Sequence, residues 1–571
     1  MKILALHSDY VKFKPLKKAL KSVDELKLKD KAGKLVKEAL MVLTAVEKGD
    51  EKIKEIVEKF VWNVKDIAKQ VQVKNIVLYP YAHLSSNLAN PEIALKVLDG
   101  AAKILKKSFK VIQAPFGYYK EFEIKVKGHP LSELSREIKV EGSSKGRIKE
   151  EEKIDYNTLL KEITKSKLDR RKLKENDHRI IGQQMDLFSF NDVAPGMPFW
   201  HNNGLIIYNE LIKFIREEIK KQGYAEIRTP EVLDVKLWKV SGHWEKYREN
   251  IFLSEYEKRT FATKPMNCPG GLLIFKEKPK SYKDLPLRFA EFGVVHRQEL
   301  SGVLAGLFRV TEFTQDDAHI FCTEAQLEDE ILKIIKLMEK VYDKFKFPFH
   351  LEFSTRPEKR IGSDKMWDKA EKSLESVLKK NKINYKLNKG DGAFYGPKID
   401  FHTEDSLGRT WQLGTIQLDF SMPERFDLEY TNEDNKKKMP VMIHRAIFGS
   451  LERFIGVLLE HTNGRLPVWL APIQVRIINF TDRNSEATKK VVSDLEQAVP
   501  GLRIDSDFRQ TTVNEKIRDA ELMRIPHIIV IGDKEEKDRT LAVRERGSKQ
   551  IKSLSLAGFS KSLKQEIEQR E

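Results

Sequence analysis

Two residues of opposite charge, Arg297 and Glu299, occupy alternate positions at the end of the segment LRFAEFGVVHRQE. The apolar residues before them predict a strand, and residues i and i+2 of a strand point to the same side. A guanidinium beside a carboxylate could hold a phosphate and a base amine at the same time. A surface ion pair on an amphipathic strand would have the same spacing, so the pair alone leaves both interpretations open.

A further cation lies at the predicted start of a helix. In HRAIFGSLERFIGVLLEH, Ser450 is expected to be the N-cap of a helix whose apolar face includes Leu451, Phe454 and Leu458. This places Arg453 in the first helical turn, where a positive charge opposes the helix dipole. The pattern therefore indicates an anionic ligand near Arg453.

Length and composition limit the class of protein that positions these residues. A chain of 571 residues exceeds the usual size of a single core, so about three domains are expected. The 103 Lys and Arg residues exceed the 86 Asp and Glu residues, giving a net charge of +17. This excess favours an RNA partner, although a lysine-rich solvated surface would give the same number.

The cysteine content and the hydropathy favour a cytoplasmic protein. Only two cysteines occur, Cys268 and Cys322, which excludes a disulfide framework and suits a reducing compartment. No apolar run approaches about 18 residues, so no membrane partner is expected. The start MKILALHSDY predicts a first strand and not a signal peptide.

Changes in pattern along the chain predict four segments. Residues 1–143 alternate strands such as NIVLYP with amphipathic helices, as in an α/β domain. Residues 144–190 are highly charged and predict a linker. Residues 191–465 are rich in strands broken by helices, and residues 466–571 predict a compact α/β domain.

Three strings in the middle segment resemble one family of enzymes. ELSGVLAGLFRVTEFTQDDAHIF resembles motif 2 of class II aminoacyl-tRNA synthetases, specifically the threonyl family. HRAIFGSLERFIGVLLEH resembles motif 3, and GYAEIRTPEV resembles motif 1, with Pro230 in the family's proline position. The resemblance runs from about Gly196 to the C-terminus. It implies a multidomain α/β and α+β chain with an antiparallel-sheet catalytic core, acting on L-threonine, ATP with Mg²⁺ and tRNA(Thr) as a homodimer.

The resemblance also implies roles for individual residues. Arg297 would hold the α-phosphate, Glu299 would read the adenine amine, and Phe313 would stack on adenine. Arg309 would bind the phosphates, and Arg453 would bind the γ-phosphate. Further substrate-site positions are Gln315, Asp317, Tyr395, Lys398, Gln412, Thr415, Gln417 and Ser450. Without the resemblance, Tyr395 would be interpreted as a buried tyrosine and Lys398 as a solvated lysine.

A zinc site is implied in the same way. Cys268, His319 and His444 are too far apart in sequence to form a spacing motif, and a lone cysteine is more commonly an inert buried residue. By resemblance they are the three ligands of one Zn²⁺, which leaves the fourth position open. Zn²⁺ that binds the amino and hydroxyl groups of threonine would reject valine, and Asp317 would accept a hydrogen bond from the hydroxyl. Serine also carries a hydroxyl group and would bind in the same way as threonine. A second site that hydrolyses the serine product is therefore needed.

The N-terminal strings LHSDY, YPYAHLSS, APFGYYKEFE and GHPLSELSR resemble the archaeal threonyl proofreading domain, itself similar to D-aminoacyl-tRNA deacylases. The implied editing residues are His83, Tyr119, Lys120 and Glu133. Lys120 beside Glu133 and His83 would polarise the ester and order a water, with help from the ribose 2′-hydroxyl. His83 could instead be a core histidine. None of the thirteen histidines forms the HxxxH pair of the bacterial editing module.

The C-terminal segment resembles the class IIa anticodon-binding fold, which implies that Glu535 and Arg544 contact anticodon bases. As isolated charges these two residues would be interpreted as solvated surface. The chain departs from the family at Gly271, where histidine is common, at Leu413, where cysteine is common, and in RVTEF, which replaces RVRGF. None of these positions is an expected zinc ligand.

Two other interpretations remain open at this point. A prolyl or glycyl synthetase is disfavoured by Cys268, His319 and His444. A synthetase-like RNA-binding regulator is disfavoured by the intact cations and Glu299. Threonine-dependent pyrophosphate exchange separates these alternatives.

Overall fold

The computed structural model describes residues 1–20, 23, 25–27, 31–85, 87–138, 160, 173–406 and 408–570. The chain divides into two compact units, Met1–Asp155 and Tyr156–Glu571. Most of the predicted linker, residues 144–172 apart from Leu160, lies outside the described residues. Among the described helices, none is long and apolar enough to cross a membrane.

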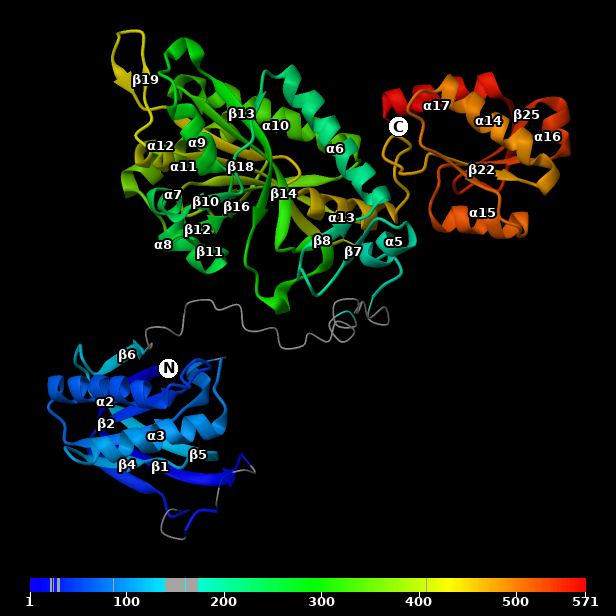
Figure 1. Cartoon of the computed structure of the whole chain (residues 1–571). Helices are drawn as coiled ribbons and strands as arrows, with labels where there is room; N and C mark the ends of the chain where they lie inside the picture. The colour runs from blue at the N-terminus through cyan, green and yellow to red at the C-terminus, as the bar shows by residue number, and fades with distance from the viewer. Residues whose placement is uncertain are drawn as a thin grey trace. The chain divides into compact units, whose positions relative to one another are not determined.

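The first unit is a mixed sheet with two helices packed on one face (Figure 1). The strand order is β4-β3-β2-β1-β5, and β6 also pairs with β1. The strands are β1 (Lys2–Lys18), β2 (Lys34–Ala45), β3 (Asn75–Pro80), β4 (Lys110–Gln113), β5 (Tyr118–Val126) and β6 (Glu133–Glu137), and the helices are α2 (Ile53–Gln70) and α3 (Pro91–Leu105). Ile56, Phe60, Val64 and Ile67 are buried at helical spacing on α2, as the sequence predicts. A short 3₁₀ turn, η1 (Ala82–Leu84), follows β3.

The second unit is built on an eight-stranded sheet of order β16-β15-β17-β18-β21-β14-β13-β9. These strands are β9 (Ala225–Glu226), β13 (Leu287–His296), β14 (Glu312–Cys322), β15 (Phe349–Ser354), β16 (Lys386–Asn388), β17 (Lys398–Glu404), β18 (Thr410–Asp419) and β21 (Val441–Ala446). The pairs between β13 and β17 in this order are all antiparallel, and only the outermost pairs, β9 with β13 and β15 with β16, are parallel.

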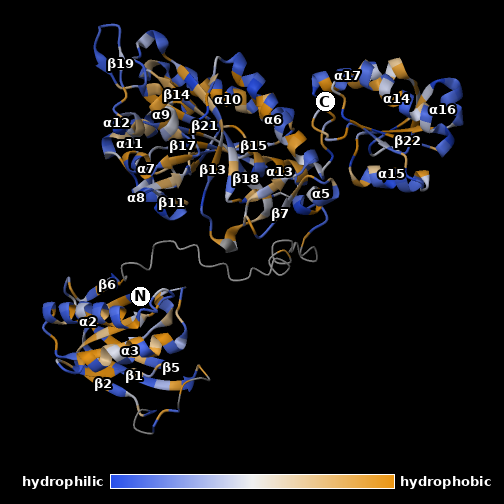
Figure 2. Ribbon diagram, viewed as in Figure 1, coloured by the Kyte–Doolittle hydropathy of each residue, from blue (hydrophilic) through white to orange (hydrophobic). Residues whose placement is uncertain are grey.

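Helices cover one face of this sheet and form the largest apolar core. They are α6 (Asn202–Lys221), α10 (Leu327–Lys344), α11 (Asp364–Lys380) and α13 (Leu451–Thr462). Figure 2 shows the apolar residues concentrated on the strands and the inner faces of these helices. The opposite face of the sheet carries α9 (Cys268–Lys276) and a second apolar cluster that includes Leu272 and Phe275.

Smaller elements complete this part of the chain. They are the pairs β7 (Phe188–Phe190) with β8 (Pro198–Trp200) and β19 (Tyr430–Thr431) with β20 (Lys437–Lys438), the sheet of β10 (Val232–Asp234), β12 (Arg259–Thr263) and β11 (Leu253–Tyr256), and the helices α5 (His178–Gln184), α7 (Val235–Val240), α8 (His243–Tyr247) and α12 (Ser421–Arg425).

The end of the predicted linker belongs to the fold. Residues 178–190 form α5 and β7, and Ile181, Leu187 and Phe188 are buried in the main core. The charged run ends before them, and the short apolar string that follows supplies the burial that a linker lacks.

The C-terminal part contains a five-stranded sheet of order β23-β22-β24-β25-β26. Its elements are β22 (Val475–Asn479), α14 (Ser485–Ala498), β23 (Ile504–Asp507), α15 (Val513–Leu522), β24 (His527–Ile531), α16 (Asp533–Asp538), β25 (Thr540–Glu545), β26 (Ile551–Ser555) and α17 (Leu556–Gln569). β22 pairs in parallel with β23 and β24, as expected for strands joined through helices. The predicted multidomain α/β and α+β class is confirmed.

Candidate active site

A cavity of about 510 Å³ lies on the face of the eight-stranded sheet that carries α9. Strand β14 shows how the two faces differ. Ala318 and Ile320 are buried in the helix-covered core, whereas the alternate residues Gln315 and Asp317 line the cavity. Because side chains alternate along a strand, the two-residue spacing of the predicted site residues in EFTQDDAH follows directly from the pleat.

The neighbouring strands β21 and β18 place further polar side chains beside those of β14. His319 on β14 lies opposite His444 on β21, and His444 lies opposite Gln417 on β18. One pair further along, Asp317 and Thr415 both lie opposite Ala446. The antiparallel register therefore brings three distant sequence strings onto one polar surface.

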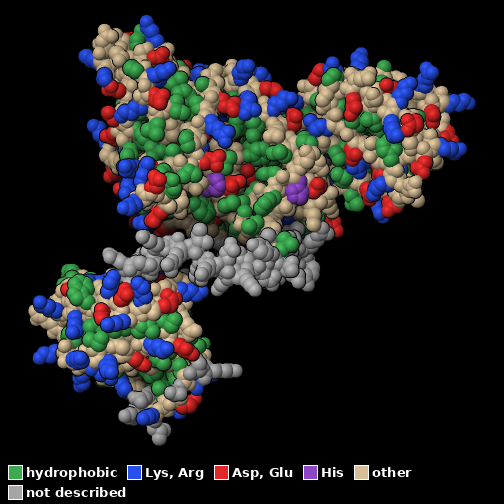
Figure 3. Space-filling view, in the orientation of Figure 1, with side chains coloured by type: hydrophobic (Ala, Val, Ile, Leu, Met, Phe, Trp, Pro, Cys, Tyr) green, Lys and Arg blue, Asp and Glu red, His purple; other side chains and the backbone are tan. Residues whose placement is uncertain are grey.

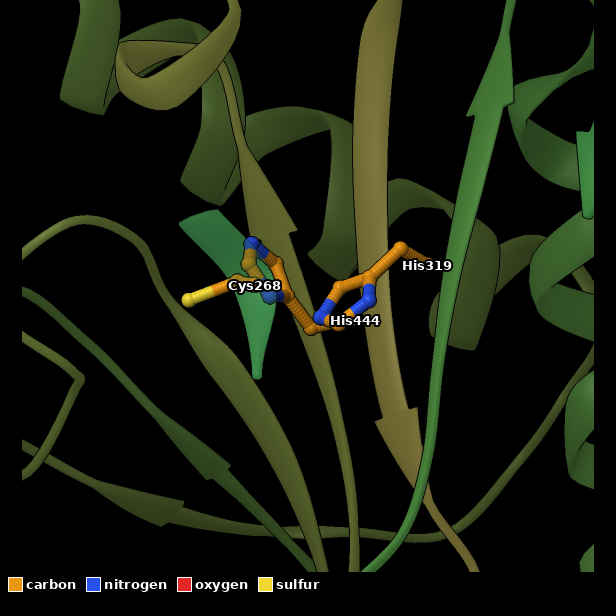
Figure 4. Close-up of side chains that lie close together, drawn as sticks. All are labelled: Cys268, His319 and His444. Carbon is orange, nitrogen blue, oxygen red and sulfur yellow. The ribbon is translucent and has the colours of Figure 1, made fainter. Parts of the chain in front are cut away.

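Cys268, His319 and His444 form one buried group at this surface (Figure 4). Their ligand atoms all lie within 4.8 Å of one another. The two imidazole rings are 5.0 Å apart, centroid to centroid, and meet edge to face. Cys268 reaches them from the first turn of α9.

The environment of the two histidines fits a metal ion. Asp419 accepts a hydrogen bond from His444 Nε2 over 2.9 Å, which leaves Nδ1 with its lone pair. The Asp419 carboxylate is itself held by the backbone N–H groups of Ser421 and Met422. His319 Nε2 is buried and has no hydrogen-bond partner among the described residues. A buried nitrogen left in this state is explained by a ligand that it coordinates.

The thiol completes the donor set. Burial raises the pKa of Cys268 well above its ordinary value, and the carboxylates of Asp317 and Asp419 act in the same direction. A thiol in this environment stays protonated unless a cation takes the place of the proton. One sulfur and two imidazole nitrogens suit Zn²⁺, with room for a further ligand on the cavity side.

A second group of possible ligands lies on β15 and β17, where the exposed His350, the buried Glu352 and the half-buried His402 lie together. Glu352 is already paired with Lys386 over 3.1 Å and accepts a hydrogen bond from Asn388. This group therefore differs from the Cys268–His319–His444 group, in which His319 Nε2 has no hydrogen-bond partner among the described residues.

The other end of the cavity is cationic, with Arg297, Arg309 and Arg453 among its lining residues. Burial, together with the charges of Arg297 and Arg309, lowers the pKa of Arg453. Its guanidinium donates to the backbone carbonyls of Phe308 and Gln412. Three guanidinium groups close together at one cavity wall favour an anionic ligand between them.

The predicted strand positions of Arg297 and Glu299 are wrong. Strand β13 ends at His296, and both residues follow it. Arg297 lies over the ring of Phe313, with 5.0 Å between the guanidinium carbon and the ring centroid. Glu299 pairs instead with Arg309 over 2.9 Å. Both residues line the cavity, but from a loop and with different partners.

The predicted helix start at Ser450 is confirmed. Ser450 is the N-cap of α13, and its hydroxyl accepts a hydrogen bond from the N–H of Arg453. Arg453 therefore lies in the first turn, as expected. Gly449, just before the cap, has a φ of 75° and packs against the backbone of Leu413, where any side chain would collide.

The further substrate-site positions predicted from the sequence all line the cavity except Lys398. They are Gln315, Asp317, Tyr395, Gln412, Thr415, Gln417 and Ser450. Tyr395 is buried, and its hydroxyl donates to Gln417. Lys398 is also buried, not solvated, and pairs with Asp391 and Asp400. Asp400 in turn accepts hydrogen bonds from Gln412 and Thr415. Lys398 thus contacts the cavity residues only through a buried carboxylate.

Two carboxylates that organise the site were missed from the sequence. Asp419, which orients His444, stands two residues after Gln417 on the same face of β18, so strand alternation could have identified it. Asp316 accepts from the N–H groups of Ile447 and Phe448 and so holds the segment before Ser450. Burial raises the pKa of Asp316 to about 7.

Leu413 and Gly271, two of the three departures from the family pattern, lie at this site. Leu413 lines the cavity. Gly271 packs beside the metal group, and a Cβ added there would lie 3.6 Å from His319 Nδ1. A larger side chain at position 271 would therefore touch the ligand ring, and glycine leaves that ring uncrowded.

The first unit contains its own cavity, of about 430 Å³. His83, Tyr119 and Lys120 line it, and His83 is exposed, which excludes the core interpretation. Burial lowers the pKa of Lys120 to about 8. The ammonium group donates to the carbonyls of Pro115 and Tyr118, each over 2.9 Å, and lies over the Tyr79 ring.

Glu133 lies elsewhere in this unit, so the predicted grouping with Lys120 is wrong for a single chain. On β1, Glu133 is opposite Leu6 and Lys120 is opposite Pro15. These positions are about 30 Å apart at roughly 3.3 Å per residue of strand. Separate short sequence strings predicted Lys120 and Glu133 as editing residues, but the register of the sheet places them far apart.

The two predicted anticodon residues are engaged within the C-terminal part. Glu535 accepts a hydrogen bond from the N–H of Gly532 at the start of α16. Arg544 pairs with Glu521 over 2.5 Å and donates to the carbonyl of Ser548. Both side chains remain partly exposed.

Three family models match the chain. They are described as the tRNA synthetase class II core domain (G, H, P, S and T), over residues 251–462, the archaea-specific editing domain of threonyl-tRNA synthetase, over residues 1–138, and an anticodon binding domain, over residues 474–566. The antiparallel sheet, the cationic cavity and the core match define a class II aminoacyl-tRNA synthetase.

Individual relatives narrow this class. A threonine–tRNA ligase of Desulforamulus reducens is 51% identical over 397 residues, and one of Desulfatibacillum aliphaticivorans is 52% identical over 397 residues. In each case the match covers 70% of this chain and 62% of the relative. The solved RNA binding domain of threonyl-tRNA synthetase from Cryptosporidium parvum is 42% identical, with a TM-score of 0.66, and the match covers 68% of this chain and 98% of that one. The chain belongs to the threonyl-tRNA synthetase family, in its archaeal type.

Proposed function

We propose that this protein is a threonine–tRNA ligase. It activates L-threonine with ATP and Mg²⁺, transfers it to tRNA(Thr), and hydrolyses Ser-tRNA in its N-terminal domain. The observation that carries the proposal is one cavity with a buried Cys268–His319–His444 group at one end and three arginines at the other. A zinc-type donor set and an anion site in one cavity match the two substrates of the activation step.

The arginine end binds ATP. Arg297 and Arg453 face the phosphates, where fixed positive charge stabilises the charge that develops during adenylyl transfer. Phe313, already stacked under Arg297, offers a flat apolar face to the adenine ring. Glu299 and Arg309 exchange their mutual ion pair for the base amine and the phosphates when ATP enters.

The metal end binds threonine. Cys268, His319 and His444 would hold Zn²⁺, which would supply a Lewis acid for the amino and hydroxyl groups of the substrate. Asp317 lies beside this group, 3.7 Å from His319 Nε2, and accepts the hydrogen bond of the substrate hydroxyl. Tyr395 with Gln417, and Gln412 with Thr415, form the polar walls, and the buried Asp400–Lys398 pair holds Gln412 and Thr415. A side chain without a hydroxyl offers Asp317 no hydrogen bond and the metal no second ligand, which is the physical basis for rejecting valine.

Each of the three domains has its own function in this proposal. Residues 1–143 edit, with Lys120 polarising the ester carbonyl and with His83 and Tyr119 at the cavity wall. Residues 191–465 activate and transfer the amino acid, and residues 466–571 bind the anticodon through Glu535 and Arg544. The excess of 17 positive charges supports tRNA binding, and Figure 3 shows Lys and Arg side chains on the surfaces of both units.

A cytoplasmic homodimer is the proposed form of the protein. The segment GYAEIRTPEV, by its likeness to motif 1, provides the dimer contact, and Val232 at its end is 54% exposed. The two cysteines are free and buried, in keeping with a reducing compartment.

Aminoacylation of defined transcripts tests the proposal. The protein, with ATP and Mg²⁺, is expected to charge a tRNA(Thr) transcript with labelled threonine and to leave a tRNA(Pro) transcript uncharged. Exchange of the anticodon bases should abolish charging. Charging of tRNA(Pro) with proline, or binding of tRNA(Thr) without any charging, would sink the proposal in favour of one of the rival interpretations.

Replacement of Arg453 by alanine is expected to lower kcat/KM for ATP about 10² to 10³-fold in threonine-dependent pyrophosphate exchange. The free energy of unfolding should change by only about 1 kcal/mol, because lost hydrogen bonds to Phe308 and Gln412 oppose the relief of a buried cation. Chemical denaturation and exchange kinetics measure the two effects. A large loss of stability with unchanged ATP kinetics would make Arg453 structural.

A further inference from the structure

His178, in the first turn of α5, lies outside the three family motifs yet joins segments that are far apart in sequence. It is fully buried, between the turn 306–308 and the end of α13. We infer that His178 is a positioning residue that holds the turn 306–308 in its ATP-binding shape. This inference rests on the proposed function, because it assigns the turn to the ATP side of the cavity.

The hydrogen bonds define the state of the ring. The backbone N–H of Leu307 donates to His178 Nε2 over 3.0 Å, so Nε2 must carry a lone pair. Nδ1 therefore carries the proton and donates it to Glu460 over 2.7 Å. Glu460 also accepts from the backbone N–H of His178 and from Arg409. Burial alone would raise the pKa of Glu460, but the hydrogen bonds from His178 and Arg409 lower it below the ordinary value. The histidine thus acts as a neutral bridge between a carboxylate and a backbone amide.

The turn is shaped around this ring. Gly306 has a φ of 54°, and a Cβ added there would lie 2.3 Å from His178 Nε2. On the other side the Phe308 ring packs against the imidazole, with centroids 4.2 Å apart. Glycine is therefore required at 306 both for its backbone conformation and for the space that His178 occupies.

The turn leads directly into the proposed ATP site. The carbonyl of Phe308 accepts from Arg453 Nε over 3.0 Å, and Phe308 lines the cavity. The next residue is Arg309, paired with Glu299. A displacement of the turn would therefore move Arg309 and remove an anchor of Arg453 together, although His178 itself lines no part of the cavity.

Two substitutions separate the two hydrogen bonds of the ring. In His178→Asn the amide stands near the position of Nδ1 and can still donate to Glu460, but it offers no acceptor to Leu307. In His178→Gln the amide oxygen reaches the position of Nε2 and can accept from Leu307, but Glu460 loses its donor. The first variant tests positioning, and the second tests the stability that the buried carboxylate requires.

The measurements are the Kd for ATP by calorimetry, the KM values for ATP and threonine in pyrophosphate exchange, and the melting temperature. His178→Asn is expected to weaken ATP binding roughly three- to tenfold with the KM for threonine nearly unchanged, and to lower the melting temperature because the Leu307 N–H loses its acceptor. His178→Gln is expected to keep the ATP affinity and lower the melting temperature. His350→Asn, at an exposed position of β15, is the matched control and should change none of them.

Equal losses of stability in both variants with unchanged ATP affinity would show that His178 only supports the fold, and unchanged values throughout would also overturn the inference. Wild-type protein that binds ATP but shows no threonine-dependent exchange would contradict the proposed function alone, since the ATP affinities of the variants still test His178. Wild-type protein that binds no ATP would overturn both.

Discussion

Substitution of Cys268 by serine is expected to abolish threonine activation, with a loss of about a thousandfold or more in threonine-dependent pyrophosphate exchange. The sulfur is one of only three proposed protein ligands, and a serine hydroxyl is a poor replacement for a thiolate toward Zn²⁺. The zinc content of the purified protein should fall in parallel from one ion per chain. ATP binding should persist, because the arginine end of the cavity is unchanged.

The second cysteine provides the control. Cys322 lies three residues beyond His319 on β14 and is buried in the helix-covered core. Cys322→Ala should keep both the zinc and the exchange activity, at a modest cost in stability. A metal-free preparation of the wild type that activates threonine at the normal rate would refute the zinc assignment.

Replacement of Lys120 by methionine is expected to reduce hydrolysis of Ser-tRNA by about a hundredfold or more while threonine activation is untouched. The ammonium group lies in a cavity of the first unit, far in sequence from the activation site, and methionine keeps the apolar length of the side chain. Mischarged Ser-tRNA should therefore accumulate during charging with serine. Deacylation of purified Ser-tRNA and Thr-tRNA measures the effect.

Two controls sharpen this result. Lys125→Met, which changes an exposed lysine of the same strand, should leave deacylation intact. Fragment 1–143, which has its own apolar core, should hydrolyse Ser-tRNA and spare Thr-tRNA. A fragment that binds RNA but cleaves neither ester would show that the domain does not edit.

The pH dependence follows from the environment of the same lysine. Because burial lowers the pKa of Lys120 to about 8, its charged form is lost as the pH rises through that value. The enzymatic rate relative to spontaneous ester hydrolysis should therefore fall above about pH 8. In Lys120→Arg this fall should be absent, because a guanidinium keeps its charge in that range.

Some features of the site could be read from local sequence because one strand or one helical turn creates them. The alternation from Phe313 to His319 on β14 and the cap at Ser450 are of this kind. Both depend on contacts within a few residues, which the pleat and the first helical turn fix. The predicted α/β and α+β organisation rests on the same periodicities.

Features that depend on register or distant packing could not be predicted. The end of β13 at His296 moved Arg297 and Glu299 into a loop, and the pairing of β1 with both β5 and β6 separated Glu133 from Lys120. His178 stood beside a charged run, and nothing near it in the sequence reveals that Glu460 is its partner. Such contacts arise from tertiary packing, which overrides local pattern.

Pyrophosphate exchange with three amino acids tests the central claim most directly. Wild-type protein with bound zinc, ATP and Mg²⁺ is expected to exchange pyrophosphate with threonine and, at a lower kcat/KM, with serine, whereas valine supports no exchange above background. This order follows from a site that requires a hydroxyl beside the Cys268–His319–His444 group and senses the methyl group only by packing. Exchange with valine comparable to that with threonine, or no exchange with any of the three, would contradict the account.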